Sequence, residues 1–280
     1  MIIRDLLQLG YEKIEEFNKE RTAAKLLLSG LLEMSYSDMF INFDKEITNE
    51  KAEEYLELLD FYVLENVPIQ YLVGSTNFYG RRFNVDERVL IPRPETEYLV
   101  DKVIKKLPND LKVLEIGTGS GCIGITLNLE KNYQVDATDI DEDALAVAET
   151  NSKINEADVN FIQSDLYENV KGKYDLIISN PPYVSETDEV EDSVLFEPEI
   201  ALYSDYFGTM HLSLIILGAV KHLNDGGMII LEHGHKHGLY IQMFVSHFIP
   251  EYRAFTLKDL QGKYRYSVIR KRGSVWKRDK

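Results

Sequence analysis

A polar residue followed by two prolines and an aromatic residue, Asn180-Pro181-Pro182-Tyr183, has the groups needed to hold an amino group. The apolar run Tyr174–Ser179 before it predicts a buried strand, which must stop there because proline donates no backbone hydrogen bond. Ligands of open α/β sheets bind at the carboxyl ends of strands. The Asn180 side-chain oxygen and the Pro181 carbonyl can accept from one planar NH2 group, and the Tyr183 ring can stack on the substrate. A structural turn after a strand is the alternative.

A glycine-rich loop, Gly117-Thr118-Gly119-Ser120-Gly121, lies upstream between a predicted strand and a predicted helix. Glycines permit a sharp turn and let a ligand approach the backbone. Asp139 ends the next predicted strand about 20 residues later, the spacing of a carboxylate that binds both hydroxyls of a ribose. The loop and this acid predict a cofactor that contains an adenosine without a phosphate on its ribose.

The acid in the strand just before the loop, Glu115, separates two such cofactors. Gly119, Gly121 and Gly124 form a G-x-G-x-x-G pattern that is typical of nicotinamide cofactors. An acid at position 115 would repel their pyrophosphate, whereas it suits the ammonium group of S-adenosylmethionine. The alternative for Glu115 is a buried acid held by backbone donors.

Asp165 and Leu166 end the third predicted strand, which should approach the adenine. The carboxylate of Asp165 can accept from the adenine amino group, and Leu166 can cover one face of the ring. A simple strand cap is the alternative for Asp165.

The elements that must position these residues alternate from Leu111 onward. The pattern predicts strands at 113–116, 135–139, 159–162, 174–179 and 228–231, and helices at 123–129, 143–154, 211–220 and 239–248. Two closing strands, 252–257 and 264–270, have no helix between them and should pair antiparallel. This order predicts an α/β protein with a Rossmann-like doubly wound sheet and a terminal antiparallel hairpin.

Two smaller regions precede this predicted domain of residues 96–280. Residues 1–67 have apolar residues at helical spacing, with Thr48 or Asn49 as a helix cap, and carry fifteen acidic and seven basic residues. They form either a solvated helical bundle or a docking module for a basic protein. Residues 68–95 alternate aromatic and β-branched residues with glycine, which predicts a β-hairpin linker. Arg93, between Pro92 and Pro94, either lines the cofactor pocket, docks the domains or forms a surface ion pair.

The composition narrows the class of partner. The formal net charge of the 280 residues is −16, so the surface would repel a nucleic-acid backbone unless it carried a local basic patch. The single cysteine, Cys122, fits a reducing compartment. With no signal peptide and no apolar stretch long enough to span a bilayer, we expect a cytoplasmic, monomeric protein. His233, His235 and His237 alternate, but no carboxylate or cysteine at metal spacing accompanies them, so we expect no metal.

With these residues in place, the chain resembles the peptide-chain release factor glutamine methyltransferases over nearly its whole length. Asn-Pro-Pro-Tyr alone is shared with DNA and RNA amino-methyltransferases, whereas Leu90-Ile91-Pro92-Arg93-Pro94-Glu95-Thr96-Glu97 is much more specific. Other similar segments are residues 68–74, 78–80, the glycine loop and Glu197-Pro198-Glu199-Ile200-Ala201-Leu202.

The resemblance implies a class I S-adenosylmethionine-dependent methyltransferase fold behind a helical N-terminal domain that helps to recognise a release factor. It implies S-adenosylmethionine as cofactor and the glutamine of a Gly-Gly-Gln motif as methyl acceptor, with an effect on translation termination. Methylation of nucleic acid through the same four residues and a non-catalytic adaptor are the alternatives.

Two segments depart from the family pattern. Residues 204–210 replace a Gly-x-Asp-Gly-Leu-like stretch, and residues 233–237 follow Glu232 where the family has Ile-Gly and a nearby glutamine. An Asp-x-x-Gly-x-x-Arg pattern is retained at Asp259, Gly262 and Arg265. The basic stretch at 271–278 is interpreted as a solvated tail.

Overall fold

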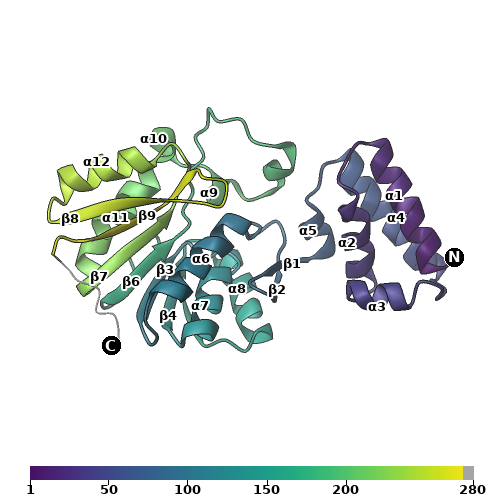
Figure 1. The fold of residues 1–280 in the computed structure, drawn as a ribbon, viewed down its shortest axis with the longest axis horizontal. Helices are drawn as coiled ribbons and strands as arrows, with labels where there is room; N and C mark the ends of the chain where they lie inside the picture. Colours follow the sequence, from purple (N-terminus) through teal and green to yellow (C-terminus); the bar gives the residue numbers. More distant parts are fainter. Residues whose placement is uncertain (274–280) are drawn as a thin grey trace. The chain divides into compact units, whose positions relative to one another are not determined.

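The structure is a computed structural model that describes residues 1–273. The chain divides into two compact units, shown in Figure 1. The first comprises Met1–Thr76 and Val190–Phe196, and the second comprises Asn77–Glu189 and the chain from Glu197 onward. The domain boundaries predicted after residues 67 and 95 stay predictions, and most of the basic tail lies outside the described residues.

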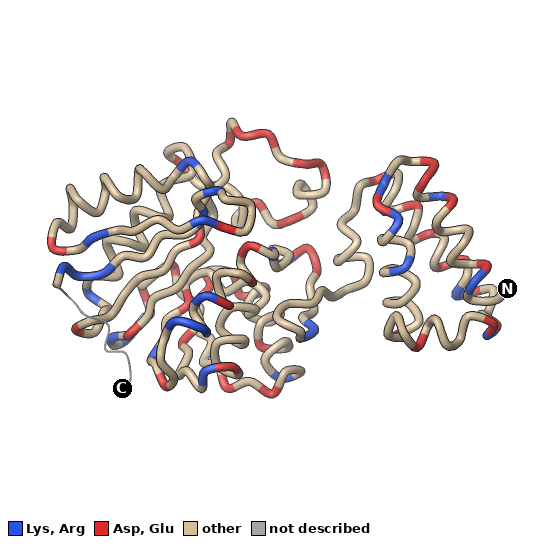
Figure 2. Tube along the Cα trace, in the orientation of Figure 1, with Lys and Arg blue, Asp and Glu red and all other residues tan. Residues whose placement is uncertain are grey.

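The N-terminal unit is a set of short helices: α1 (Ile3–Glu16), α2 (Thr22–Leu31), α3 (Tyr36–Ile41), α4 (Asn49–Leu64) and α5 (Ile69–Val73). Thr48 caps α4 as predicted, because its hydroxyl accepts from the Lys51 N–H at 3.3 Å. Helices α1 and α4 approach closely where Gly10 faces Tyr55, since a Cβ at position 10 would lie 2.0 Å from the tyrosine hydroxyl. Acidic residues recur along these helices in Figure 2.

The predicted hairpin is present as β1 (Ser75–Phe78) and β2 (Arg81–Asn84). Its turn uses Tyr79 and Gly80, both at positive φ. Residues 69–73, which the alternating pattern placed in this hairpin, form helix α5 instead. Ile69, Leu72 and Val73 pack against the helical core, so burial outweighs their strand propensity. The linker is therefore shorter than predicted.

The second unit contains a seven-stranded sheet of order β5-β4-β3-β6-β7-β9-β8. The strands are β3 (Lys112–Ile116), β4 (Gln134–Asp139), β5 (Val159–Gln163), β6 (Tyr174–Ser179), β7 (Leu223–Glu232), β8 (Tyr252–Lys258) and β9 (Tyr264–Lys271). Strands β3 to β7 are parallel, and β9 runs antiparallel to both β7 and β8. The predicted doubly wound sheet with a terminal hairpin is confirmed. The strand order reverses between β3 and β6, which is the usual place for a ligand.

Helices cover both faces of this sheet (Figure 1). The adjacent residues Val113 and Leu114 point to opposite faces and belong to two separate cores. One core packs α6 (Pro94–Lys106) and α7 (Cys122–Lys131) on the sheet, and the other packs α11 (Met210–His222) and α12 (Gly238–Phe248). The remaining elements are α8 (Glu142–Ile154), η1 (Asp192–Phe196), α9 (Glu199–Leu202) and α10 (Asp205–Gly208). Within residues 1–273, no helix is long and apolar enough to cross a membrane.

Candidate active site

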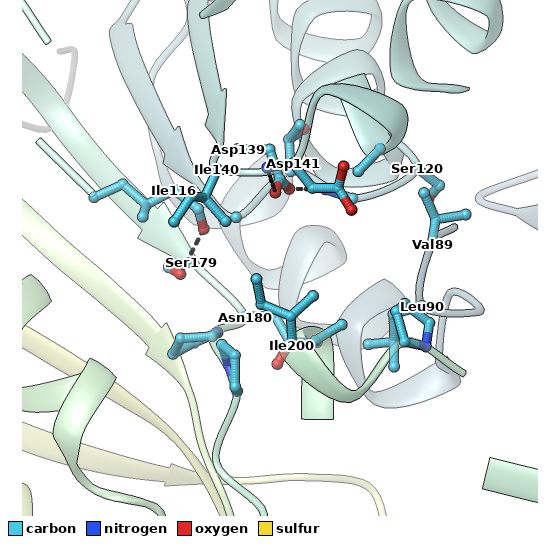
Figure 3. Close-up of a pocket in the computed structure, with 18 of the residues that line it drawn as sticks. Val89, Leu90, Ile116, Ser120, Asp139, Ile140, Asp141, Ser179, Asn180 and Ile200 are labelled. Atoms are coloured by element: carbon cyan, nitrogen blue, oxygen red, sulfur yellow. Dashed lines mark hydrogen bonds between the residues drawn. The ribbon is translucent and has the colours of Figure 1, made fainter. Parts of the chain in front are cut away.

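A cavity of about 1100 Å³, open to solvent, lies at the carboxyl ends of β3, β4, β5 and β6. Figure 3 shows side chains from several strand ends and from the segment before α6 gathered around it. The predicted site residues among those that line it are Gly117, Thr118, Gly119, Ser120, Asp139, Asp165, Leu166, Asn180, Pro181 and Pro182. Glu115, Gly121 and Tyr183 do not line it.

The glycine loop opens toward the cavity. Gly117 and Gly119 have φ of 71° and 52°, and no atom lies within 4 Å of the Cβ that either would carry. Their left-handed backbone favours glycine, and the open space on that side lets a ligand lie against the main chain. Gly121 has another role, because a Cβ there would lie 2.8 Å from Ile125 where the loop packs on α7.

Glu115 braces this loop from behind. Its side chain is fully buried, and its Oε2 accepts from the Thr118 hydroxyl at 2.8 Å and from the Gly124 N–H at 2.9 Å. Burial raises the pKa of Glu115 to about 8. The geometry matches the alternative of an acid held by donors, although Oε1 has no partner. A direct contact between Glu115 and a ligand ammonium stays a prediction.

Asp139 ties the second strand to the loop. Its carboxylate accepts from the Gly119 N–H at 2.8 Å and from the Asp141 N–H at 3.2 Å. Burial raises the pKa of Asp139. Asp139, Ile140 and Asp141 all line the cavity, and Asp141 also caps α8. A carboxylate at this place is available to ribose hydroxyls, as predicted from its position in the sequence.

The end of β5 contributes Ser164, Asp165 and Leu166 to the cavity. Leu166 has a φ of 47°, and the Ser164 hydroxyl accepts from the Asn169 N–H at 2.9 Å. This turn presents an apolar side chain beside a carboxylate, which is the combination expected for an adenine.

The Asn180 side chain has one free end. Its Nδ2 donates to the Thr96 hydroxyl at 3.3 Å, while its buried Oδ1 has no hydrogen-bond partner. A buried acceptor without a donor costs free energy, so this oxygen is available for a ligand donor. Pro181 and Pro182 line the same part of the cavity.

Tyr183 points away from the cavity. Its hydroxyl interacts with Glu232 and Arg265, and its ring lies 6.4 Å from that of His237. Burial raises the pKa of Tyr183. Stacking of this ring on the substrate stays a prediction, and the contacts present indicate a bracing role.

Arg93 lines the cavity and also forms an ion pair with Glu197. Glu197 is buried and accepts from the Ile91 N–H at 3.1 Å, so the pair is not a surface contact. Two segments that resemble the same family, around Ile91-Pro92-Arg93-Pro94 and Glu197-Pro198, are thereby joined. Arg88, the second base of the lining, is also paired, with Asp86 at 2.6 Å.

The two segments that depart from the family pattern meet in space. His237 Nε2 lies 3.1 Å from the Phe207 carbonyl, and a Cβ on Gly208 would lie 2.2 Å from the Tyr183 carbonyl. His233 is buried, with Nε2 2.9 Å from the Ser267 hydroxyl. These histidines therefore take part in local packing and hydrogen bonding. Among residues 1–273, no group of three or more potential metal ligands occurs.

Three residues near the cavity were not predicted as site residues. Thr96 and His211 line it, and Glu232 lies behind Thr96, whose hydroxyl donates to Glu232 Oε2 at 2.8 Å. Thr96 looks like a helix-opening residue in the sequence. Glu232 had a usable signal, since an acid at the end of a buried parallel strand is where site residues gather. His211 carries no comparable signal.

A mostly parallel seven-stranded sheet with this loop, acid and Asn-Pro-Pro-Tyr turn defines the class I methyltransferases. Residues 94–200 match the family model "Methyltransferase small domain", and residues 5–74 match "PrmC N-terminal domain". A solved methyltransferase from Pyrococcus furiosus superposes with a TM-score of 0.55 at 21% identity, covering 81% of this chain and 100% of that one, which supports the fold.

Two curated relatives place the chain more closely. It is 36% identical to the release factor glutamine methyltransferase of Streptococcus pneumoniae, over 92% of this chain and 94% of that protein. It is 39% identical to the enzyme of the same name from Lactococcus lactis subsp. lactis, over 82% of this chain and 87% of that protein. The chain belongs to the release factor glutamine methyltransferase family.

Proposed function

We propose that this protein transfers a methyl group from S-adenosylmethionine to the side-chain amide nitrogen of the glutamine in the Gly-Gly-Gln motif of peptide-chain release factors, and so modulates translation termination. The observation that carries the proposal is the unpartnered, buried Oδ1 of Asn180 beside Pro181 at the cavity wall. Family membership supplies the class of substrate. The proposed setting is a monomer in the cytoplasm.

The cavity suits S-adenosylmethionine. Open space in front of Gly117 and Gly119 lets the cofactor lie against the loop. Asp139 and Asp165 can accept from ribose hydroxyls and from the adenine amino group, and Ile140 and Leu166 supply apolar contact for the base. When bound, S-adenosylmethionine supplies an electrophilic methyl group on a sulfonium sulfur.

The residues of the Asn-Pro-Pro-Tyr turn act on the acceptor. An amide nitrogen is a poor nucleophile because its lone pair is delocalised into the carbonyl. The Asn180 Oδ1 and the Pro181 carbonyl accept from its two N–H groups, which orients the nitrogen and raises its electron density. Positioning of this kind supplies most of the rate, and the proton can leave after transfer, so no dedicated base is required.

We further propose that the N-terminal helical unit recognises the release factor. Its match to the family's N-terminal model and its acidic character support this role. Nucleic acid is the less favourable substrate. The two basic residues of the cavity lining are both paired with acids, and three acids, Asp139, Asp141 and Asp165, lie among the other lining residues.

The proposal is tested by methyl transfer from labelled S-adenosylmethionine. The acceptors are an intact release factor, the same factor with its Gly-Gly-Gln glutamine changed to alanine, and a mixed DNA and RNA pool. Label on the intact factor alone is the expected result. Label on nucleic acid would establish the amino-methyltransferase alternative, and cofactor binding without transfer to any acceptor would exclude release factor methylation. Loss of both binding and transfer would favour the adaptor.

A further inference from the structure

The surroundings of Asn180 contain a hydrogen-bonded chain that the proposed mechanism does not yet use. Asn180 Nδ2 donates to Thr96 Oγ1 at 3.3 Å, and Thr96 Oγ1 donates to Glu232 Oε2 at 2.8 Å. Thr96 is 2% exposed and Glu232 is 1% exposed, so water competes little for these groups. The three residues come from the first turn of α6, the end of β6 and the end of β7.

We propose that Thr96 and Glu232 are positioning residues that hold the Asn180 amide with its oxygen, and not its nitrogen, toward the acceptor glutamine. The inference rests on the proposed function and deepens it. It assigns to two residues outside the Asn-Pro-Pro-Tyr turn the polarity of the acceptor site.

The argument depends on the number of protons available. A carboxylate only accepts hydrogen bonds, and a threonine hydroxyl has one proton to donate. When Thr96 donates that proton to Glu232, it can only accept from Asn180, which turns Nδ2 toward Thr96 and leaves Oδ1 toward the cavity. The two ends of an asparagine amide have nearly the same shape, so shape alone does not fix this choice.

The reversed amide would disable the site. An Asn180 NH2 group facing the NH2 group of the acceptor glutamine would place donor against donor. The glutamine nitrogen would then lose one of its two acceptors, and its orientation would depend on the Pro181 carbonyl alone. Thr96 and Glu232 therefore affect transfer without touching the transferred group.

The charge state of Glu232 is set by groups from four neighbouring segments. Burial raises the pKa of Glu232 to about 7, and the acid Glu95 on α6 raises it further, while hydrogen bonds from Thr96 and Tyr183 and the charge of Arg265 on β9 oppose the rise. Arg265 is in turn held by Asp259 at 3.4 Å. Cys122 on α7 and Tyr266 on β9 also face this carboxyl, and burial raises the pKa of each.

Protonation of Glu232 would reverse the chain. A protonated carboxyl can donate to Thr96, and Thr96 can then donate to Asn180 Oδ1, the atom that the substrate needs. Transfer should consequently fall as the pH is lowered through about 7, the value to which burial raises the pKa of Glu232. Glutamine at position 232 has no such titration.

The test compares Thr96→Val, which keeps the shape but loses the hydroxyl, with Thr96→Ser, which keeps the hydroxyl. We expect Thr96→Val to lower kcat by about tenfold or more, with the Kd for S-adenosylmethionine changed less than threefold, because misplacement of a reacting group acts on the rate. Thr96→Ser should stay within about threefold of wild type. In Glu232→Gln, the fall in kcat between pH 8 and pH 6 should disappear.

Each outcome decides the question. Wild-type kcat in Thr96→Val overturns the inference, and so does an equal loss in the valine and serine variants together with a lower Tm, which marks a structural role. If Thr96→Val does not fold, the pH profile of Glu232→Gln decides, and an unchanged acid limb overturns the inference. Wild-type protein that labels no release factor overturns the proposed function itself, and the inference with it.

Discussion

The two walls of the cavity are built in different ways. The cofactor wall, residues 117–120 and 139–141, is shaped by main chain: Gly119 N–H is bound by Asp139, 20 residues away, and Gly124 N–H by Glu115, 9 residues away. The acceptor wall, Thr96, Asn180, Pro181 and Pro182, is held by side chains, with Thr96 84 residues from Asn180 and 136 from Glu232.

This difference separates two kinds of dependence. The cofactor wall needs a backbone path, so glycines and the acids that bind its N–H groups matter most. The acceptor wall needs particular oxygen and hydrogen atoms in a fixed order. Substitutions should therefore divide into those that weaken cofactor binding or folding and those that slow transfer, and the following predictions test that division.

The largest effect is expected at Asn180. Asn180→Ala removes the unpartnered oxygen and should lower kcat by about a hundredfold, comparable to the loss of one preorganised hydrogen-bonding group in other enzymes. Binding of S-adenosylmethionine, measured by calorimetry, should change little. Asn160→Ala, at an exposed asparagine of β5, serves as the matched control and should retain wild-type activity. Near-normal turnover in Asn180→Ala would remove the acceptor wall from the mechanism.

A smaller effect is expected at Asp139. Asp139→Asn keeps an oxygen for the Gly119 N–H but loses the charge that strengthens bonds from ribose hydroxyls, so the Kd for S-adenosylmethionine should rise about tenfold with kcat nearly unchanged. Asp141→Asn is the control, because asparagine also caps a helix well. If the affinity falls in the control and not in Asp139→Asn, the ribose is bound by the neighbouring carboxylate.

Two glycines of one loop should respond differently. Gly121→Ala places a methyl group against Ile125 at a φ of 81°, and should destabilise the fold by about 1–2 kcal/mol, seen as a lower Tm. Gly119→Ala carries a similar backbone cost but projects its methyl group into open space at the cavity. Only the second variant should also weaken cofactor binding. Equal affinities in the two variants would contradict the assignment of the open space to the ligand.

The smallest effect concerns Glu115 and pH. Because burial raises its pKa from an ordinary 4.5 to about 8, the folded ligand-free protein keeps a proton that the unfolded chain releases. The resulting stability is complete below the ordinary pKa and is lost as the pH rises through 8, by about 1 kcal/mol between pH 7 and pH 8. Urea unfolding of Glu115→Gln should lack this part of the decline. The exposed Glu168→Gln should show the wild-type decline, and identical slopes in all three proteins would refute the prediction.

The same contrast explains what the sequence could predict. The loop, Asp139 and the Asn-Pro-Pro-Tyr turn each follow a strand, and strand ends of a parallel sheet meet at one edge, so local patterns placed them together. The hydrogen bond from Thr96 to Glu232 depends on how α6 packs beside β7, which no local spacing encodes. Helix α5 was missed for the same reason, because packing against the helical core decided its conformation.

Glu115 and Tyr183 show a second limit. Their residue types and positions suited a ligand, but the direction of a side chain depends on which partners surround it. Glu115 meets the Thr118 hydroxyl and the Gly124 N–H, and Tyr183 meets Glu232 and Arg265. A sequence motif therefore located the neighbourhood of the site more accurately than the role of each residue in it.

The position of β9 between β7 and β8 has a consequence for biosynthesis. The Tyr266 hydroxyl on β9 donates to the Glu95 carbonyl at 2.8 Å, across 171 residues, at the helical turn that carries Thr96. A nascent chain that has emerged as far as β5 already contains the glycine loop and its acids, whereas the support of Thr96 waits for a strand made near the end of the described chain. Cofactor-binding parts can thus form early during synthesis, and methyl-transfer competence is acquired late.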